Sequence, residues 1–148
     1  MPERQRARYA NWLRAAAVYN AAWGAANVLM PGRMFRALGM PDPEPPAAWQ
    51  TVGMMVAVYA PAYWWASRDP VEHSHVVAVG LLGKLLGPGG FVWAVKTGRL
   101  PLRFGRTLLT NDVVWWPVFA AIVRDGVSAA GGWEAYLRGP ISPAAARS

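Results

Sequence analysis

The sequence contains no cysteine, which excludes disulfide bonds, thiol nucleophiles and thiolate metal ligands. Charged residues are also scarce, at 16% of the chain against roughly 25% in an average soluble domain. Hydrophobic residues reach 54%, and nine residues are tryptophan, whose apolar ring and polar N–H suit a membrane–water interface. The composition therefore favours an integral membrane protein. The alternative is a compact soluble helical protein with a Trp-rich core.

Acidic residues are fewer than basic ones, and the net charge of +7 could indicate a nucleic-acid partner. The basic residues, however, gather in short clusters within residues 4–14 and 96–106, directly beside apolar segments. Such clusters are attracted to anionic lipid head groups, and no nucleic-acid-binding motif accompanies them. We therefore expect membrane lipids as partners and no nucleic acid.

Four apolar segments, separated by charged or proline-rich connectors, divide the chain. The expected membrane spans cover residues 12–30, 47–66, 75–95 and 107–123. Because most connectors are short, successive helices should run antiparallel, so we expect an all-α fold, an integral membrane four-helix up-down bundle. Residues 31–38 should form a short interfacial helix with Phe35 and Leu38 towards the membrane. The membrane domain would be residues 1–126, followed by an interfacial or disordered tail, residues 127–148.

Two charged residues lie deep inside the expected spans, Lys84 in the third and Asp112 in the fourth. A charge at bilayer depth is costly unless it is paired or hydrated, so each residue is a candidate for a functional site. The two could form an internal strut between their helices, or a functional ion pair that relays protons or binds a ligand. The third alternative is that each side chain reaches the nearer interface alone.

Amide side chains extend this polar interior. Asn20 and Asn27 share one face of the first span, with Trp23 between them, and Asn111 adjoins Asp112. Amides in a bilayer commonly form hydrogen bonds between helices, which is the structural interpretation. Together with the two charged residues, however, they would give three of the four spans a polar face, and this favours an interior site.

Aromatic residues have two interpretations. Tyr59 and Tyr63 lie one helical turn apart on the second span, and Trp115 lies in the fourth. An aromatic belt at the membrane interface would account for most of the tryptophans. The alternative is a pocket with aromatic walls that binds a flat apolar ligand.

The third span is rich in glycine. Gly83 and Gly87 have the small-xxx-small spacing that lets a neighbouring helix approach closely. Residues 87–90, Gly-Pro-Gly-Gly, predict a kink or local unwinding, which a membrane tolerates only against protein or water.

No sequence pattern assigns catalysis or a cofactor. Residues 80–91 are glycine-rich but lack the preceding strand and the ending of a nucleotide-binding loop. His73 and His75, beside Glu72, would point apart on a helix and lack a convincing third ligand, so we expect no metal site. No catalytic residue is assigned, and no cofactor is expected.

Residues 49–54, 82–88 and 109–116 resemble segments of small bacterial four-span membrane proteins of unknown function. The resemblance covers about residues 10–124 and implies this topology in a bacterial inner membrane, without an activity. A looser similarity, in span number and aromatic content, is to small membrane proteins that bind sterols or porphyrins. Four-span sterol isomerases likewise place acidic, Asn and Trp side chains in a lipid-facing cavity. This chain lacks the intramembrane Glu or His partner for Asp112 that an isomerase mechanism would use.

With an even number of spans, both termini share one side, and that side carries slightly more basic residues, which favours cytoplasmic termini. The favoured function is non-enzymatic, namely binding of a hydrophobic small molecule or an accessory role in a homo-oligomer or larger membrane complex. The alternative is a small lipid- or isoprenoid-modifying enzyme that uses Asp112 and Lys84 as acid and base. The third hypothesis is a subunit of an oligomeric proton- or ion-coupled carrier.

Overall fold

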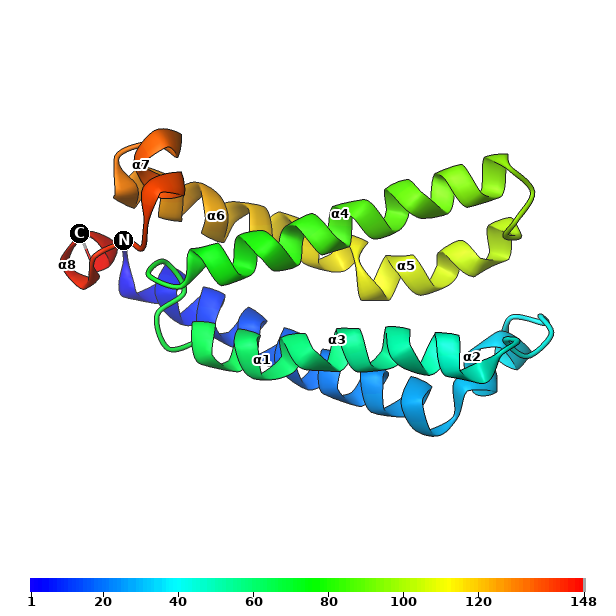
Figure 1. The fold of residues 1–148 in the computed structure, drawn as a ribbon. Coiled ribbons are helices and arrows are strands. Elements are labelled where there is room, and N and C mark those ends of the chain that lie inside the picture. Colours follow the sequence, from blue (N-terminus) through cyan, green and yellow to red (C-terminus); the bar gives the residue numbers. More distant parts are fainter. Residues whose placement is uncertain (148) are drawn as a thin grey trace.

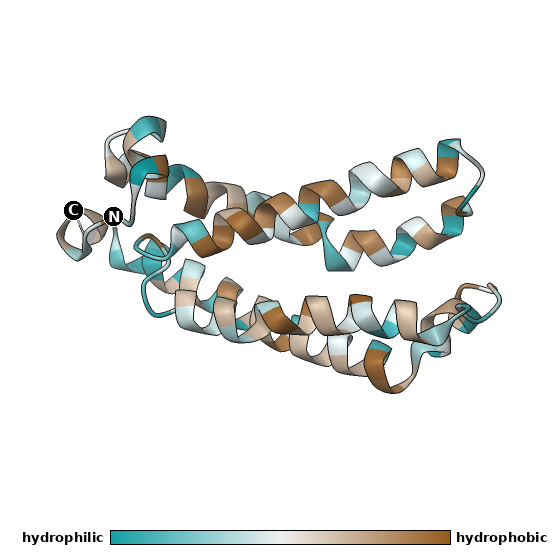
Figure 2. Ribbon diagram, viewed as in Figure 1, coloured by the Kyte–Doolittle hydropathy of each residue, from teal (hydrophilic) through white to brown (hydrophobic). Residues whose placement is uncertain are grey.

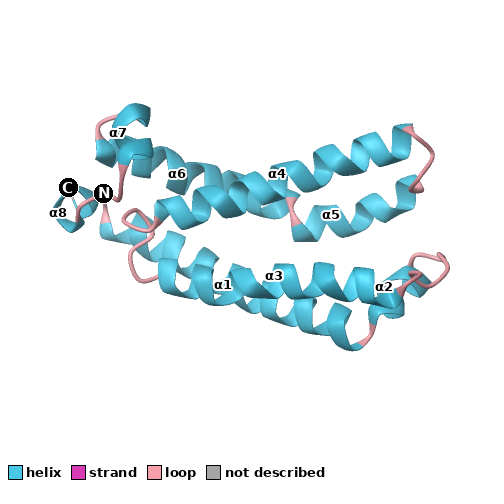
Figure 3. Cartoon of the chain, viewed as in Figure 1, coloured by secondary structure: helices cyan, strands magenta, loops and turns pink. Residues whose placement is uncertain are grey.

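The computed structural model describes residues 1–147, and within this range the chain is helical and contains no strand. The all-α class is therefore confirmed. The long helices are α1 (Glu3–Leu29), α3 (Pro46–Ala66), α4 (Ser74–Lys96) and α6 (Trp116–Ala130). The short elements are α2 (Pro31–Ala37), η1 (Leu102–Phe104), α5 (Gly105–Asn111), η2 (Val113–Trp115), α7 (Trp133–Arg138) and α8 (Pro143–Arg147). Each apolar segment forms helix, although the fourth is interrupted between α5 and α6 (Figure 3).

The long helices follow one another in an up-down order and form two hairpins (Figure 1). α1 and α3 pack side by side along most of their length, while α4 pairs with α5 and α6. The hairpins meet at the end of the molecule that holds both termini, and they separate towards α2. We call these two regions the closed end and the open end.

α1 and α3 approach closely because small residues lie between them. A Cβ atom on Gly24 would lie 2.7 Å from Ala57 Cβ and 2.7 Å from the Gly53 carbonyl oxygen, so only glycine fits. The small-xxx-small spacing predicts this kind of contact at Gly83 and Gly87 instead. No neighbouring heavy atom in the described chain lies within 4 Å of a Cβ placed on Gly83, so that expectation is wrong.

The closed end holds the hydrophobic core. Side chains that are at most 1% exposed come from all four long segments: Tyr9 and Leu13 of α1, Tyr63 of α3, Val77 of α4, and Phe119 and Ile122 of α6. Burying a Leu, Ile or Phe side chain contributes about 1.5–3 kcal/mol each. This end therefore carries most of the packing free energy of the fold.

Polar contacts fasten the same end. Gln5 Nε2 donates hydrogen bonds to the Tyr9 hydroxyl (2.9 Å) and to Asp125 Oδ2 (2.8 Å), and the Tyr9 hydroxyl donates to the same oxygen (2.8 Å). Burial raises the pKa of the Tyr9 hydroxyl, so it stays a neutral donor. Arg6 forms an ion pair with Asp69, with 2.6 Å between Nη1 and Oδ2. These contacts join the start of α1 to α6 and to the turn between α3 and α4.

The C-terminal tail packs on the closed end. Tyr136 of α7 is buried, and its ring stacks on His75 with the centroids 3.9 Å apart. Ile141 and Ala146 are also buried, and Arg6 donates a hydrogen bond to the Ala146 carbonyl oxygen (2.8 Å). The described part of the tail is therefore folded, which differs from the disordered ending that its Pro, Ala and Ser content predicts.

Two helical segments are long and apolar enough to cross a membrane, namely Ser74–Lys96 and Leu102–Ala130. The prediction of four membrane spans is thus not confirmed by length and hydropathy. α1 carries arginine and asparagine, and α3 contains Gln, Tyr, Trp and Pro, which lower the mean hydropathy of these two helices. Figure 2 shows the strongly hydrophobic positions concentrated on α4, α5 and α6, whereas α1 and α3 are paler.

Candidate ligand-binding site

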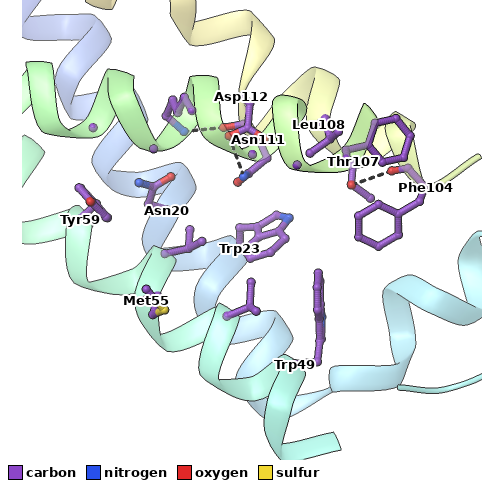
Figure 4. Close-up of a pocket in the computed structure, with 18 of the residues that line it drawn as sticks. Asn20, Trp23, Trp49, Met55, Tyr59, Phe104, Thr107, Leu108, Asn111 and Asp112 are labelled. Atoms are coloured by element: carbon purple, nitrogen blue, oxygen red, sulfur yellow. Dashed lines mark hydrogen bonds between the residues drawn. The ribbon is translucent and has the colours of Figure 1, made fainter. Parts of the chain in front are cut away.

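A cavity of about 560 Å³ lies between the two hairpins, and all four long segments line it (Figure 4). Its lining residues are Asn20 and Trp23 of α1; Trp49, Val52, Met55, Val56, Tyr59 and Tyr63 of α3; Gly80, Gly83, Lys84, Gly87, Gly90 and Phe91 of α4; and Leu100, Phe104, Thr107, Leu108, Asn111 and Asp112 of the following segment. Small-molecule sites typically have volumes of roughly 300–1,000 Å³. The cavity is therefore large enough for one such ligand.

Aromatic rings line the part of the cavity that lies towards the open end of the molecule. Trp49 meets Trp23, Phe104 and Phe35 edge-on, with centroid distances of 6.0, 5.9 and 5.0 Å. Such edge-to-face pairs are favourable beyond the area they bury. Phe35 belongs to α2 and is 8% exposed, so the expectation that it faces the membrane is wrong. Its ring instead packs against Trp49 and Phe104, with centroid distances of 5.0 and 6.1 Å.

Asn27 holds Trp49 from outside the cavity. Trp49 Nε1 donates a hydrogen bond to Asn27 Oδ1 (2.7 Å), and Asn27 Nδ2 donates to the Trp23 carbonyl oxygen (2.8 Å). Asn27 is buried but does not line the cavity. It is therefore a positioning residue, in agreement with the structural interpretation of the interior amides.

A stripe of glycines on α4 gives the cavity its width. Gly80, Gly83, Gly87 and Gly90 recur at spacings of three and four residues, so they share one face of the helix. The Tyr63 ring lies directly over Gly80, where a Cβ atom would be 2.1 Å from the Tyr63 hydroxyl oxygen. At Gly83 and Gly90, Cβ atoms would meet no described neighbour within 4 Å. The helix backbone itself therefore forms this wall.

The fourth segment is interrupted beside the glycine stripe. α5 ends at Asn111, Asp112 has φ −123° and ψ −63°, and α6 begins at Trp116 after the short η2 turn. The sequence of residues 111–117, N-D-V-V-W-W-P, explains the interruption. Asn and Asp side chains compete for backbone hydrogen bonds, β-branched valines are stiff, and proline has no N–H to donate.

By contrast, α4 remains helical through residues 87–90, so the unwinding expected there is wrong. Pro88 has no N–H to donate to the carbonyl oxygen of Lys84, four residues earlier. Trp116 Nε1 donates to this carbonyl oxygen instead, at 3.1 Å. A side chain from the neighbouring segment thus replaces the missing helical hydrogen bond.

The carbonyl groups released at the end of α5 also find side-chain donors. Lys84 Nζ donates to the Asn111 carbonyl oxygen, and Trp115 Nε1 donates to the Thr110 carbonyl oxygen (2.9 Å). An ammonium group at the C-terminal end of a helix also interacts favourably with the helix dipole. Trp115 does not line the cavity; its ring centroid lies 5.8 Å from Lys84 Nζ and supports it from behind.

Lys84 and Asp112 are 6% and 5% exposed, so neither side chain reaches an interface alone. Within residues 1–147 no ion pair joins them directly. The Asp112 carboxylate accepts a hydrogen bond from Asn111 Nδ2 (3.3 Å) and attracts Lys84 at longer range. The geometry corresponds most closely to a strut, in which Lys84 joins α4 to the interrupted segment through a main-chain carbonyl group.

Two buried amide oxygens in the cavity wall, Asn20 Oδ1 and Asn111 Oδ1, have no hydrogen-bond partner among the described residues. Asn20 is 2% exposed, and it lies across the cavity from Asn111 and Asp112 (Figure 4). Buried polar atoms in proteins are normally hydrogen-bonded. The two unpaired acceptors therefore mark a polar inner end, where a ligand could complete the hydrogen bonding.

The cavity brings together most of the site residues predicted from the sequence: Asn20, Trp23, Tyr59, Tyr63, Lys84, Asn111 and Asp112. Asn27 and Trp115 lie behind its wall. Three aromatic lining residues, Trp49, Phe91 and Phe104, are not predicted from the sequence, because their approach depends on how the two hairpins diverge. The helical spacing of the four α4 glycines was the signal that could have revealed that wall.

The two histidines lie at the closed end and do not line the cavity. His73 Nδ1 forms a hydrogen bond with the Asp69 carbonyl oxygen (3.0 Å), and His75 Nε2 forms one with the Tyr136 carbonyl oxygen (2.7 Å). Among the described residues, no group of three His, Asp or Glu side chains is placed to hold a metal ion.

Comparison of the chain with protein-family models, with curated proteins and with solved structures gave no match. The resemblance to four-span bacterial membrane proteins therefore gains no support from relatives. Function has to be argued from the residues of this chain.

Proposed function

We propose that this chain is a small integral membrane protein that binds one hydrophobic small molecule between its hairpins and does not transform it. The cavity carries the proposal. It has a volume of about 560 Å³, largely apolar and aromatic walls, and a buried polar inner end. Ligand sites commonly combine these features, with the apolar wall supplying affinity and a few polar groups supplying orientation.

The outer surface supports a membrane location. Only 17% of the apolar stretch in Ser74–Lys96 and 28% of that in Leu102–Ala130 is buried inside the molecule. A soluble core helix of this hydropathy would be mostly buried. Leu82, Leu86 and Trp93 of α4 are all more than half exposed, and extended apolar patches of this kind are rare on soluble monomers. A bilayer would cover this surface.

α1 and α3 complete the membrane domain in this proposal. The 21 residues of α3 span about 31 Å at 1.5 Å per residue, close to the hydrocarbon thickness of roughly 30 Å. Its exposed side chains include Met54, Val58 and Trp64. In α1, Asn20 and Asn27 lower the hydropathy but are buried against other segments. Interior amides therefore account for part of the low hydropathy of α1 without placing those groups in lipid.

Lys84 supports binding rather than catalysis. Its ammonium group already donates to the Asn111 carbonyl oxygen, and it lies at the end of α5. A side chain fixed in this way stabilises the helix interruption, whereas an acid or base must exchange its proton with a substrate. The proposal therefore assigns Lys84 a structural role beside the ligand.

Reporter fusions test the membrane topology. Fusions after Pro43, Asp69, Gly98 and Ser128 should report alternating sides, with both termini in the cytoplasm of a bacterial host. If Pro43 and Asp69 report the same side, the four-span arrangement is wrong. A complete but inverted pattern would contradict only the orientation.

Native mass spectrometry after extraction in a mild detergent tests the ligand binding. We expect one nonpolar molecule per chain, retained through detergent removal and released by collisional activation. Recovery of the folded chain without any bound molecule, from extracts that contain the host lipids, would contradict the proposal.

A further inference from the structure

We propose that the cavity recognises a neutral amphiphile whose head group donates hydrogen bonds, as the hydroxyl group of a long-chain alcohol does. This inference rests on the proposed ligand-binding function and adds the chemistry of the head group. It is carried by the inner end of the cavity, where the buried lining atoms without a hydrogen-bond partner among the described residues are both acceptor oxygens.

Three side chains supply the acceptors. Asn20 Oδ1 and Asn111 Oδ1 are buried and have no partner within the described chain. Asp112 Oδ1 accepts one hydrogen bond, from Asn111 Nδ2, and no described residue donates to Oδ2. Asn20 is 2% and Asp112 5% exposed, so little solvent reaches them. An unpaired buried acceptor is unfavourable, and a ligand hydroxyl group that donates to one of these oxygens would remove the penalty for that oxygen.

The glycine stripe keeps these oxygens accessible. A Cβ atom on Gly87 would lie 3.5 Å from Asp112 Oδ2, its nearest neighbour there. Towards the closed end, Gly83 has no described neighbour within 4 Å of its Cβ position. The face of α4 that is turned towards Asp112 therefore carries no side chains at these glycines, and a head group can lie against the backbone there.

Three nitrogen donors near this end each donate to a main-chain oxygen. Lys84 Nζ donates to the Asn111 carbonyl, Trp115 Nε1 to the Thr110 carbonyl, and Trp116 Nε1 to the Lys84 carbonyl. Asn20 Nδ2 and Trp23 Nε1 also belong to lining residues, but neither is among the buried atoms without a partner. Tyrosine hydroxyls further along the wall can donate or accept, so they do not change the balance. An acceptor-only head group would leave the buried oxygens of Asn20 and Asn111 without a hydrogen-bond donor.

Charge favours a neutral head group. Lys84 is the only cationic side chain among the lining residues described, and its attraction to Asp112 offsets the two charges. A carboxylate head group would be repelled by Asp112, and an ammonium head group would be repelled by Lys84. A hydroxyl group donates a hydrogen bond without bringing a further charge into the interior.

The remainder of the cavity fits an apolar tail. Its walls towards the open end include Trp49, Val52 and Phe104. Met55 also lines the cavity and is 65% exposed, so the cavity opens past α3 to the surface that lipid would cover. A head group between Asn20 and Asp112 would thus leave the tail directed towards the bilayer.

A series of probes with one tail and different head groups tests this inference. The detergent-solubilised full chain is titrated with hexadecan-1-ol, 1-methoxyhexadecane, hexadecanoate and hexadecylamine, and occupancy is measured by native mass spectrometry. We expect the alcohol to bind about five- to tenfold more tightly than the methyl ether, the difference that the one hydrogen bond donated by the hydroxyl group supplies. The carboxylate and the amine should also bind more weakly than the alcohol.

Each outcome of the series decides one question. Equal binding of alcohol and ether would overturn the head-group inference and leave the proposed function intact. Tightest binding of the carboxylate would overturn donor recognition, and tightest binding of the amine would overturn the neutral head group. If none of the four probes binds, the proposed ligand-binding function itself fails.

Substitution of Asn20 gives a second readout. Asn20→Leu removes the whole amide and should reduce the alcohol-over-ether preference, because the Oδ1 acceptor is lost while those of Asn111 and Asp112 remain; ether binding should stay within about twofold. Asn11→Leu is the matched control, since Asn11 is an exposed asparagine of the same helix and does not line the cavity. An unchanged preference in Asn20→Leu would contradict the role of Asn20. If that variant does not fold, the probe series on the unaltered chain still decides.

Discussion

The hydrogen bond from Trp116 to the Lys84 carbonyl oxygen predicts a thermodynamic coupling between Trp116 and Pro88. Trp116→Phe keeps an aromatic ring but removes the N–H that satisfies this carbonyl. Because Pro88 has no N–H, the helix cannot supply a replacement. In a Pro88→Ala background, however, the alanine N–H can form the ordinary helical hydrogen bond. The same Trp116→Phe substitution should then cost much less.

The structure sets the size of this coupling. A buried carbonyl oxygen without a partner costs about 1–3 kcal/mol, while hydrogen bonds measured inside membrane proteins average about 0.6 kcal/mol and reach about 1.7. Lys84 is buried, and its carbonyl faces the interrupted segment, so we expect a coupling of about 1 kcal/mol. The loss of indole ring contacts in Trp116→Phe is common to both backgrounds and cancels in the cycle.

A double-mutant cycle measures this coupling directly. It compares the free energies of unfolding of the unaltered chain, Trp116→Phe, Pro88→Ala and the double variant. Reversible unfolding in mixed micelles, followed by circular dichroism at increasing fractions of dodecyl sulfate, provides these values. Trp116→Phe should destabilise the unaltered chain by more than it destabilises Pro88→Ala. Costs in the two backgrounds that agree within about 0.3 kcal/mol would refute the compensation of Pro88 by Trp116.

Three further substitutions probe the closed end, the cavity wall and the aromatic cluster. Tyr9→Phe removes the hydrogen bonds to Gln5 and Asp125 and should lower the free energy of unfolding by about 1–2 kcal/mol, with ligand occupancy in native mass spectrometry unchanged. Gly80→Ala places a methyl group 2.1 Å from the Tyr63 hydroxyl oxygen and should cost about 1–3 kcal/mol in unfolding measurements; a melting temperature equal to that of the unaltered chain would contradict the close contact. Asn27→Leu removes the acceptor that orients Trp49 and should weaken hexadecan-1-ol binding severalfold, whereas undiminished binding would show that Trp49 needs no such support.

The helical segments could be predicted from the sequence because apolar runs end at proline, glycine or charge. The second and third spans were expected at residues 47–66 and 75–95, and the structure has Pro46–Ala66 and Ser74–Lys96. The start of α1 at Glu3 was missed, because arginine, glutamine and alanine are good helix formers outside a membrane as well. An apolar run predicts where a membrane span lies, whereas the helix propensity of the residues before it extends α1 beyond the expected span.

The place of the interruption could not be predicted from one segment at a time. Pro88 followed by two glycines is the stronger local signal for an interruption. α4 nevertheless continues, because Trp116 donates a hydrogen bond to the Lys84 carbonyl oxygen that Pro88 leaves without a helical partner. The break lies at Asp112, where Lys84 and Trp115 donate hydrogen bonds to the released carbonyl oxygens. Which interruption forms depends on donors from the neighbouring segment, and their register appears only in the folded chain.

The separate roles of the Asn20 and Asn27 side chains could not be predicted from the sequence either. Asn20 and Asn27 were expected on one polar face of the first span, and both are buried. Asn20 has an unpaired oxygen in the cavity wall, whereas Asn27 orients Trp49 from behind it. The sequence contains no feature that separates these roles, because the separation comes from the angle between the hairpins.

The central claim, that a hydrophobic molecule occupies the cavity, is tested most directly by filling the cavity from the glycine stripe. Gly83→Leu introduces a side chain at a lining position where no described atom lies within 4 Å of the Cβ position. Gly89→Leu is the matched control, because Gly89 is an exposed glycine of the same helix that has no neighbour either and does not line the cavity. Native mass spectrometry should show the bound molecule lost from Gly83→Leu and retained by Gly89→Leu, with both variants folded. Equal retention by the two variants would place the ligand elsewhere and contradict the account.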